Sequence, residues 1–293
     1  MEFYVNEFKN HLINEKKVSD NTFSNYLRDV LSFLSFKNYD SFPSGKDVEV
    51  FEDFLIAKGK SKSTVSRVNA SLRCYFSFLN KSNLYAEKPP IKTLSVKLED
   101  KQLPEILTVI EVEKLLNAPD TTTYKGIRDR AILEVLYATG IKPTELIELK
   151  LSNVNIKLNY IKLTNDKKER ILPMYDEAVE VLNDYIKNAR NFLSEDNCDA
   201  LFLNMNGSAL TRQGLWKIIK QNADNSGIKK EITPNILRHS FAVHLMENGA
   251  APNDVKEIMG FNDISSTKIY SQIFKTKYAK NYNRFHPLAK KIT

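Results

Sequence analysis

Two stretches near the end of the chain decide the fold: TPNILRHSFAVHLMENGA at residues 233–250 and IMGFNDISSTKIYSQI at residues 258–273. The apolar spacing of the first predicts a helix at 234–248. Arg238 lies on that helix, and Tyr270 follows it by 32 residues, within the second stretch. A side chain able to bind phosphate through a planar fork is thus followed by a hydroxyl able to act as a nucleophile.

The region around these stretches mixes helices with a small β-rich patch. Helical periodicity recurs at residues 109–117, 126–138, 176–193, 212–225 and 252–258, with a last helix after Thr276. Alternating segments predict strands at 154–158, 160–163 and 170–173, the last two joined by a polar turn at 165–168. We therefore expect a mixed α+β domain.

The first third of the chain is predicted to be helical. Capping residues at 19–22 precede an apolar helical face at 23–34, and similar spacing recurs at 48–55 and 63–79. Four cations lie in and before the last of these segments: Lys60, Lys62, Arg67 and Arg73. They form either a solvated helix face or a set of phosphate contacts.

Residues 86–104, AEKPPIKTLSVKLEDKQLP, separate the two regions. This stretch contains three prolines and alternating charges but little hydrophobic periodicity. Such a composition is typical of an extended, exposed linker. The chain has 293 residues, and a domain usually takes about 100–200. Two domains are therefore expected.

The overall composition favours an anionic partner. Lysine and arginine number 43 against 36 aspartates and glutamates, a net charge of +7, which does not by itself choose between DNA, RNA and a membrane surface.

Cys74 and Cys198 form no paired motif, so a reduced, cytoplasmic setting is expected. The charged N-terminus argues against a secretory signal, and the apolar run at 131–141 is too short to span a bilayer. We expect a soluble protein with no membrane partner.

Motifs for metal or nucleotide chemistry are missing from the sequence. His239 and His244 are five residues apart, which does not place them on one helix face as zinc ligands require. There is no glycine-rich phosphate loop and no nucleophile elbow. The sequence thus predicts no metal and no cofactor, and it disfavours nucleotide hydrolysis.

Four segments occur in a defined order: LYATGIKPTELIELKL at 136–151, KLTNDKKERILP at 162–173, and the two stretches quoted first. Their order and spacing resemble the tyrosine recombinase (phage integrase) family, in particular its Xer-like members. The resemblance covers nearly the whole chain. It implies a mainly α fold with a small β-sheet, made of an all-helical, SAM-like core-binding domain at 1–85, a linker at 86–105 and a mixed α+β catalytic domain at 106–293. It also implies a subunit-contact segment from about residue 275.

Members of that family cut DNA without a metal. A tyrosine attacks the scissile phosphate, forms a 3′-phosphotyrosyl link and frees a 5′-hydroxyl. Two cationic forks stabilise the charge of the transition state, a lysine on a hairpin protonates the leaving oxygen, and two His-type groups handle protons. The resemblance assigns Tyr270 as the nucleophile and Arg238 as the second phosphate-binding arginine. Tyr278 and Tyr282 lie nearby, but the spacing selects Tyr270.

Four positions depart from the family's pattern. They are Lys142 at the first arginine, Asn165 at the hairpin lysine, Asn235 at the histidine and Phe261 at the His/Trp position. A lysine keeps the charge but loses the planar fork. Neither an asparagine nor a phenylalanine exchanges a proton near neutral pH.

Other residues near these positions have two interpretations each. Lys167 and Lys168 are either substitutes for the missing acid or exposed turn lysines. His239, one helical turn past Asn235, is either a substitute for the histidine or a core residue. Glu145, which in the family helps to hold the first arginine, pairs with the lysine at that position or caps the local helix.

The leading hypothesis is a sequence-specific or site-preferring DNA-binding protein with the recombinase fold whose cutting and rejoining activity is lost or much reduced. Its partners would be double-stranded DNA and, on that DNA, a second copy or a related recombinase. One alternative is an active site-specific recombinase acting through Tyr270. The other is a protein-interaction module that does not bind DNA, whose affinity for DNA would be absent or insensitive to salt.

Overall fold

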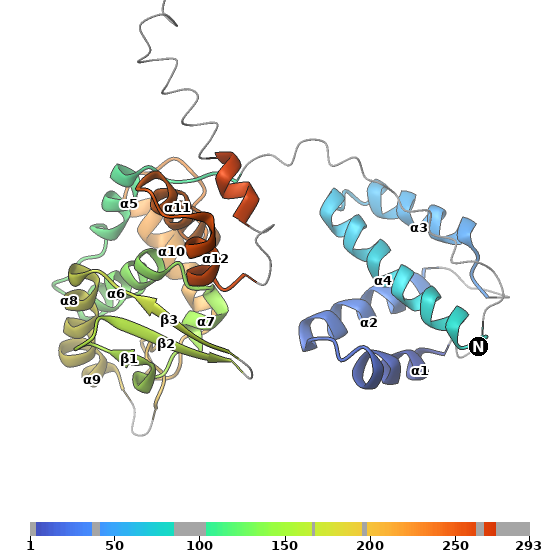
Figure 1. Ribbon diagram of the computed structural model, residues 1–293, viewed down its shortest axis with the longest axis horizontal. Coiled ribbons are helices and arrows are strands. Elements are labelled where there is room, and N and C mark those ends of the chain that lie inside the picture. Colours follow the sequence, from blue (N-terminus) through green and yellow to red (C-terminus); the bar gives the residue numbers. More distant parts are fainter. Residues whose placement is uncertain are drawn as a thin grey trace, which may run out of the picture. The chain divides into compact units, whose positions relative to one another are not determined.

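The computed structural model describes residues 4–36, 42–84, 104–165, 168–194, 198–261 and 267–273. The chain divides into two compact units, Met1–Lys101 and Gln102–Thr293 (Figure 1). The division falls inside the predicted linker at 86–105, of which only residues 104 and 105 are described. Over the described ranges, no helix has both the length and the hydrophobicity needed to cross a membrane.

The N-terminal unit is all helical, as the sequence predicted. Its elements are α1 (Val5–Asn10), the π-helical turn η1 (His11–Glu15), α2 (Asp20–Leu34), α3 (Gly45–Ala57) and α4 (Lys62–Lys81). Ser19 and Ser61 cap α2 and α4, since each side chain accepts the backbone N–H three residues further on. Phe33, Phe51 and Phe76 are buried and fill the core with aromatic rings.

The elements α1 and η1 were not predicted from the sequence. Both are short, and a helix of so few turns is marginal by itself in water. They are held by Phe8 and Leu12, which are buried against the rest of the unit. The Phe8 ring meets the Tyr75 ring edge-on, with 5.1 Å between the centroids. Tertiary packing therefore stabilises these elements.

The second unit surrounds one central helix. Its helices are α5 (Val109–Leu116), α6 (Tyr124–Thr139), α7 (Pro143–Ile147), η2 (Leu151–Asn153), α8 (Asp176–Asp184), η3 (Tyr185–Arg190), α9 (Asn191–Leu193), α10 (Arg212–Asn225), α11 (Pro234–Glu247) and α12 (Pro252–Met259). A further helical segment covers residues 267–273. Helix α6 contacts α5, α8, η3, α11 and the sheet, and residues all around it are buried (Figure 1).

The sheet is antiparallel, with the strand order β1 (Val154–Asn155), β2 (Tyr160–Asn165) and β3 (Lys168–Pro173). The strand predicted at 154–158 ends early because the Asn155 side chain accepts the Leu158 N–H at 3.0 Å, and Asn159 then adopts a φ of 55°. The hairpin is also tighter than predicted. Asn165 and Lys168 are paired strand residues and not turn residues.

The predicted helices are present with small changes at their ends. Helix α10 spans the predicted range in full, whereas the predicted helix at 176–193 is a run of α8, η3 and α9. The short helix α7 was not predicted. The helix expected after Thr276 lies outside the described residues.

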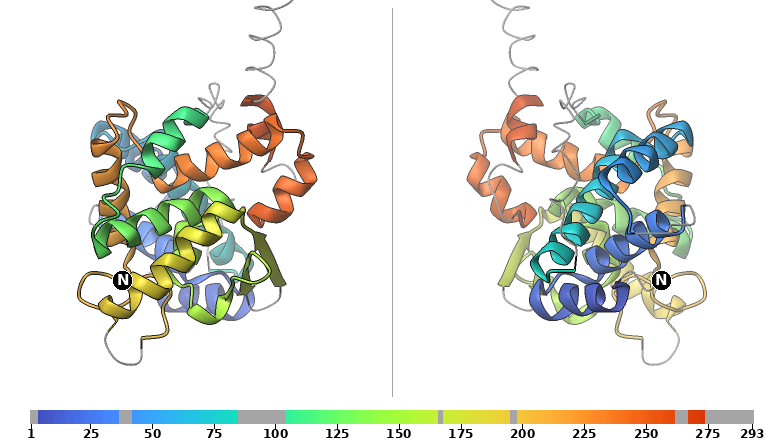
Figure 2. Two further views of the ribbon diagram at one scale, coloured as in Figure 1. Left: turned by 90° about the vertical axis from the view of Figure 1, so that its left-hand side faces the viewer. Right: turned by 90° about the vertical axis from the view of Figure 1, so that its right-hand side faces the viewer.

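The segment 267–273 packs on α11 and α12. Tyr270 and Ile273 join buried residues of both helices, among them Phe241 and Val255, in one hydrophobic cluster. Figure 2 shows α11, α12 and this segment grouped at one side of the unit. This packing brings Tyr270 beside the middle of α11.

Candidate active site

A glycine turn at the end of α6 places Lys142. Gly140 has a φ of 56°, and a Cβ atom there would lie 2.3 Å from the Phe241 ring, so only glycine fits. Two residues later, the Lys142 N–H donates to Glu145 Oε2 at 3.0 Å, and Lys142 Nζ lies 3.6 Å from Glu145 Oε1. The Lys142 side chain is 44% exposed. The charge of Lys142, which is predicted to stand at the first-arginine position, is therefore open to solvent.

Arg238 is held inside the fold. Thr233 caps α11 and Pro234 fills its first turn, which places Arg238 in the second turn of the helix. The residue is 5% exposed, and its guanidinium donates to the carbonyls of Gly140 and Met259, the latter at 2.6 Å. Burial lowers the pKa of Arg238 to about 10, so it stays cationic at neutral pH. Arg238 therefore ties the end of α6 to the end of α12.

Tyr270 is 2% exposed and reaches α11 through its hydroxyl. Its Oη lies 3.0 Å from His239 Nδ1. Burial raises the pKa of Tyr270, and the charge of Arg238 opposes that shift only in part. The phenol therefore keeps its proton at neutral pH.

The Phe261 ring lies between the two family-matching residues. Its centroid is 5.3 Å from Arg238 Cζ, a cation–π contact, and 6.1 Å from the centroid of the Tyr270 ring, with 25° between the ring planes. The side chain has no atom that donates or accepts a hydrogen bond. Phe261, which is predicted to stand at the family's His/Trp position, therefore contributes packing and no proton transfer.

Arg170 is a site residue that sequence analysis missed. It projects from β3, and its Nη2 donates to Glu145 Oε2 at 2.6 Å. A Cβ atom on Gly260 would lie 1.6 Å from Arg170 Nη1, so the guanidinium rests on the glycine that ends α12. Both Arg170 and Glu145 are close enough to Arg238 for their charges to act on its pKa. The only sequence signal was a charged residue in a strand, which does not identify its partner.

Lys142 and Asn235 line one open cavity of about 330 Å³. Arg212 and Trp216, both exposed side chains of α10, line the same cavity. It offers two cations, an amide and an aromatic face. Arg212 and Trp216 were not predicted as site residues, because only the tertiary fold brings α10 beside α7.

The hairpin candidates for the general acid are only partly described. The backbones of Asn165 and Lys168 pair where β2 and β3 end. Their side chains and all of Lys167 lie outside the described residues. Their catalytic roles stay predictions.

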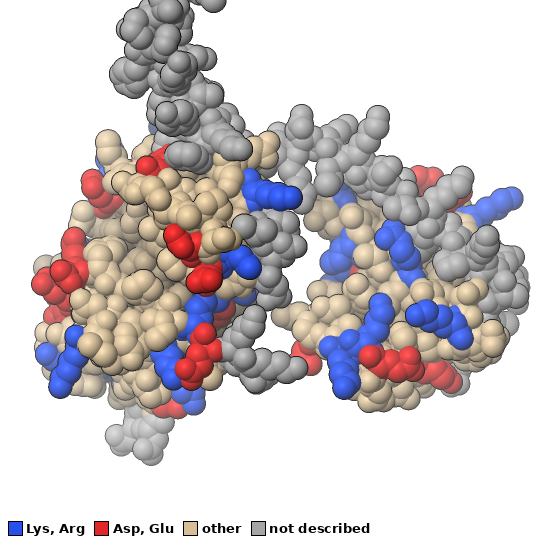
Figure 3. Space-filling view, viewed as in Figure 1, with Lys and Arg blue, Asp and Glu red and all other residues tan. Residues whose placement is uncertain are grey.

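The four cations selected in the N-terminal unit have different environments. Lys60, Lys62 and Arg73 are exposed, and Figure 3 shows Lys and Arg side chains spread over the visible face of this unit. Arg67 instead forms an ion pair with the buried Asp29, which also accepts from the Ser71 hydroxyl at 2.7 Å. At 100° per residue, Arg67 points away from the side of α4 that Lys62 and Arg73 share.

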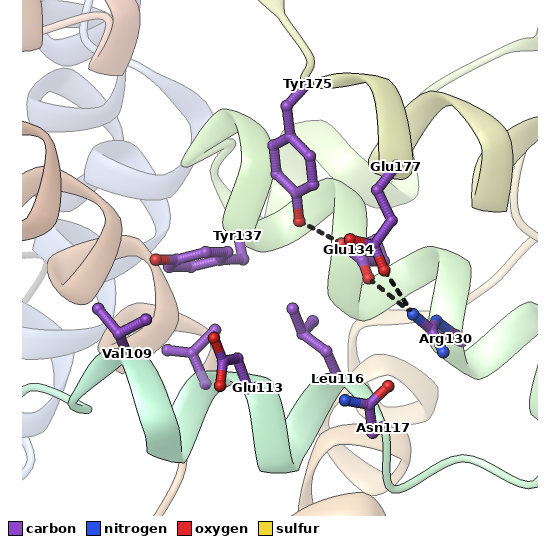
Figure 4. A pocket seen from close by; sticks show the side chains of 10 residues that line it. Val109, Glu113, Leu116, Asn117, Arg130, Glu134, Tyr137, Tyr175 and Glu177 are labelled. Atoms are coloured by element: carbon purple, nitrogen blue, oxygen red, sulfur yellow. Dashed lines mark hydrogen bonds and ion pairs between the residues drawn. The ribbon is translucent and has the colours of Figure 1, made fainter.

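A second cavity, of about 370 Å³, lies between α5, α6 and α8 and contains none of the predicted site residues. Figure 4 shows Tyr175 donating to the carboxylate of Glu134, which also forms an ion pair with Arg130. Burial raises the pKa of Glu134, while Tyr175 and Arg130 oppose that shift. Three glutamates line the cavity, but within the described part of the chain no His, Cys, Asp or Glu cluster is arranged to hold a metal ion.

Sequence comparisons identify the family. The model of the phage integrase family matches residues 105–277, and that of the phage integrase N-terminal SAM-like domain matches residues 5–83. "Tyrosine recombinase XerD" of Listeria innocua is 40% identical over 97% of this chain and 99% of its own length. The protein of the same name from Staphylococcus haemolyticus is 38% identical over 99% of this chain and 100% of its own length. The chain therefore belongs to the phage integrase family.

Solved structures share the fold. XerH site-specific recombinase bound to palindromic difH substrate aligns with a TM-score of 0.75 at 22% identity, over 89% of this chain and 79% of that one. The Tn1549 transposon integrase in complex with transposon right end DNA gives a TM-score of 0.72 at 21% identity, over 91% and 94%. The mainly helical fold with a small sheet is thus confirmed. Within the tyrosine recombinase (phage integrase) family, the chain is a Xer-like member.

Proposed function

We propose that this chain binds double-stranded DNA with a preference for particular sites, and that its cutting and rejoining activity is lost or much reduced. The observation that carries the proposal is the cavity shared by Lys142 and Asn235. It offers cations and an amide to a phosphate but no imidazole to exchange a proton and only one planar fork, that of Arg212. The relatives named tyrosine recombinase XerD and the structural neighbour in complex with transposon right end DNA support DNA as the ligand.

The exposed cations of the N-terminal unit extend this proposal. Lys60, Lys62 and Arg73 are candidates for contacts with backbone phosphates, which would make binding weaken as salt is added. On DNA, the chain would associate with a second copy or a related recombinase. The segment proposed for that contact, from about residue 275, lies outside the described residues. The cytoplasmic location stays a prediction.

The test begins with the DNA that the protein binds in its host cell. Binding to the recovered duplex is measured at several salt concentrations, and a nicked form of the same duplex is then assayed for a denaturant-resistant adduct. Wild type is compared with a restored variant that carries Lys142→Arg, Asn165→Lys, Asn235→His and Phe261→His. Tyr270→Phe is the control for the nucleophile.

We expect salt-sensitive binding by both proteins and an adduct that forms at least about 10²-fold faster with the restored variant, since one such donor alone is worth that much. A restored variant that binds but stays inert would show that these four positions do not explain the low activity. Wild type reacting as fast as the restored variant would establish an active recombinase instead. Binding that is absent, or unchanged by salt, would overturn the proposal.

The second candidate function is that of an active recombinase forming a 3′-phosphotyrosyl intermediate through Tyr270. One observation favours it: Arg238 and Tyr270 are packed against the same Phe261 ring. The proposed phosphate-binding cation and the proposed nucleophile therefore contact the same side chain. An adduct that forms with wild type and is lost in Tyr270→Phe would support this function.

A further inference from the structure

Helix α11 carries two histidines that each hydrogen-bond a tyrosine from elsewhere in the chain. His239 Nδ1 lies 3.0 Å from Tyr270 Oη, and His244 Nδ1 lies 2.9 Å from Tyr137 Oη. Five residues separate the histidines, so at 100° per residue they face different sides of the helix. Only the first pair lies beside Arg238. The second pair is a chemically matched control within the same molecule.

The protonation states of His239 and Tyr270 determine which of the two donates the hydrogen bond. Burial, and then the charge of Arg238, lower the pKa of His239, so the imidazole is neutral at neutral pH. Burial raises the pKa of Tyr270, so the phenol is protonated. The phenol therefore donates to His239 Nδ1, and the remaining imidazole proton is on Nε2.

We propose that His239 is the catalytic base that takes the proton of Tyr270 when the tyrosine attacks DNA. The Tyr270 Oη–P bond forms, the P–O5′ bond breaks, the phenolic proton moves to His239 Nδ1, and the 5′-oxygen takes a proton from water. The attack requires the segment 267–273 to bring the buried hydroxyl to the phosphate. This inference rests on the proposed binding of DNA.

The neighbouring positions strengthen the assignment. The resemblance assigns Asn235 and Phe261 to the positions of the family's proton-handling groups, and neither residue exchanges a proton near neutral pH. Among the described residues, His239 is the imidazole in contact with Tyr270 Oη. With His239 as the base, Tyr270 would still work as a nucleophile. The slow parts of the cleavage reaction would be charge stabilisation at Lys142 and protonation of the leaving 5′-oxygen.

The test separates activation of the nucleophile from protonation of the leaving group. Duplexes of the recovered binding site are made with a single 5′-bridging phosphorothiolate, one duplex for each position across the bound centre. A thiol has a pKa of about 8.5, so it leaves as the thiolate without an acid. Adduct formation is followed with wild type and with Lys142→Arg, each with and without His239→Gln or His239→Asn.

We expect His239→Gln and His239→Asn to slow adduct formation by about 10²-fold or more, the usual contribution of a general base. The control His244→Gln should react like its parent. The wild-type rate should rise with pH and level off once His239 is neutral. The rate of His239→Gln should continue to rise with pH until Tyr270 itself ionises.

Equal rates with and without His239 would overturn the inference. So would the lack of an adduct in both wild type and Lys142→Arg when both bind the duplex, since a base is then present and no acid is needed. Failure to bind DNA at all would instead overturn the proposed function.

A measurement without DNA tests the pair in every case. The chain has four histidines, so the imidazole signals are assignable by NMR with single substitutions. Tyr270→Phe removes the donor that favours neutral His239, so the pKa of His239 should rise. An unchanged pKa would contradict the hydrogen bond on which the inference depends.

Discussion

The cluster formed by the buried residues Arg238 and Tyr270 with the partly buried Phe261 differs from the open cavity at Lys142 in how the side chains are engaged. In the cluster, the guanidinium binds two backbone carbonyls and the rings stack. In the cavity, Lys142 and Arg212 face solvent. Residues in the cluster have a structural role in addition to any catalytic one, whereas the side chains of the cavity are open to a ligand. Substitutions in the cluster should therefore lower the stability of the fold. Substitutions in the cavity should change ligand binding and leave stability nearly unchanged.

The largest effect is expected at Arg238. Arg238→Ala leaves the carbonyls of Gly140 and Met259 buried without donors, which should destabilise the second unit by about 3 kcal/mol or more. Unfolding in urea, followed by the fluorescence of Trp216, reports on this unit, since it is the single tryptophan. Arg212→Ala is the control from the cavity, with an expected change within about 0.5 kcal/mol. Equal losses would remove the distinction between the regions.

Gly260 tests how tightly Arg170 is held. Gly260→Ala combines a left-handed backbone at φ 64° with a collision against a guanidinium that is bound to Glu145. Gly227→Ala is matched, with φ 69° and no atom within 4 Å of the added Cβ. The free energy of unfolding should fall by about 1 kcal/mol in the control, because of backbone strain alone. In Gly260→Ala it should fall by about 1–2 kcal/mol more, because of the collision. The same loss at both sites would mean that Arg170 moves aside freely.

The N-terminal unit offers the same contrast in a smaller form. Arg67→Ala removes the ion-pair partner of the buried Asp29 and should cost about 1–2 kcal/mol of stability, because Ser71 still donates to that carboxylate. Arg73→Ala should leave stability unchanged. It should reduce the magnitude of the slope of the logarithm of the DNA-binding constant against the logarithm of salt concentration by about one. Thermal unfolding and binding titrations distinguish the two outcomes. The reverse pattern would make Arg67 the phosphate contact.

Glu134 gives a pH dependence of known sign. Its pKa in the folded state is raised above 4.5, mainly by burial. Between the pKa of Glu134 in the unfolded state and its higher pKa in the folded state, the folded state binds more protons than the unfolded state. The free energy of unfolding therefore falls as pH rises through this range. Glu134→Gln, which keeps an acceptor for Tyr175, should gain stability relative to wild type as the pH increases from 4 to 7. A difference that stays constant with pH would show that Glu134 titrates normally.

The smallest change in stability is expected at Lys142. Lys142→Ala should alter the free energy of unfolding by less than about 0.5 kcal/mol, because the side chain is half exposed and Arg170 still pairs with Glu145. It should nevertheless reduce, by about one, the magnitude of the slope of the logarithm of the DNA-binding constant against the logarithm of salt concentration. Lys142→Arg is the matched variant, for which we expect the slope to be kept. A large loss of stability would place Lys142 with the buried cluster.

Much of the fold was predictable because it depends on local periodicity. The helix at 212–225 was predicted to the residue. Spacing alone selected Arg238 and Tyr270 as site residues, and their roles stay predictions. The first strand ended earlier than predicted because one side chain, that of Asn155, turned the backbone. Helix α1 was missed because burial of Phe8 stabilises it, and burial is not visible in a short charged segment.

The sequence by itself determined the order of the longer helices and strands and the family, since these depend on residue type and spacing along the chain. The four replaced positions stay a prediction. The tertiary structure decided which side chains meet. Only folding brings Tyr270 to His239, 31 residues away, and Arg170 to Glu145, 25 residues away. Folding also separates Arg67, which is bound to Asp29, from its exposed neighbours. Contacts of this kind depend on how helices pack, and the hydrophobic pattern of one segment carries no information about the polar partner that another segment will supply.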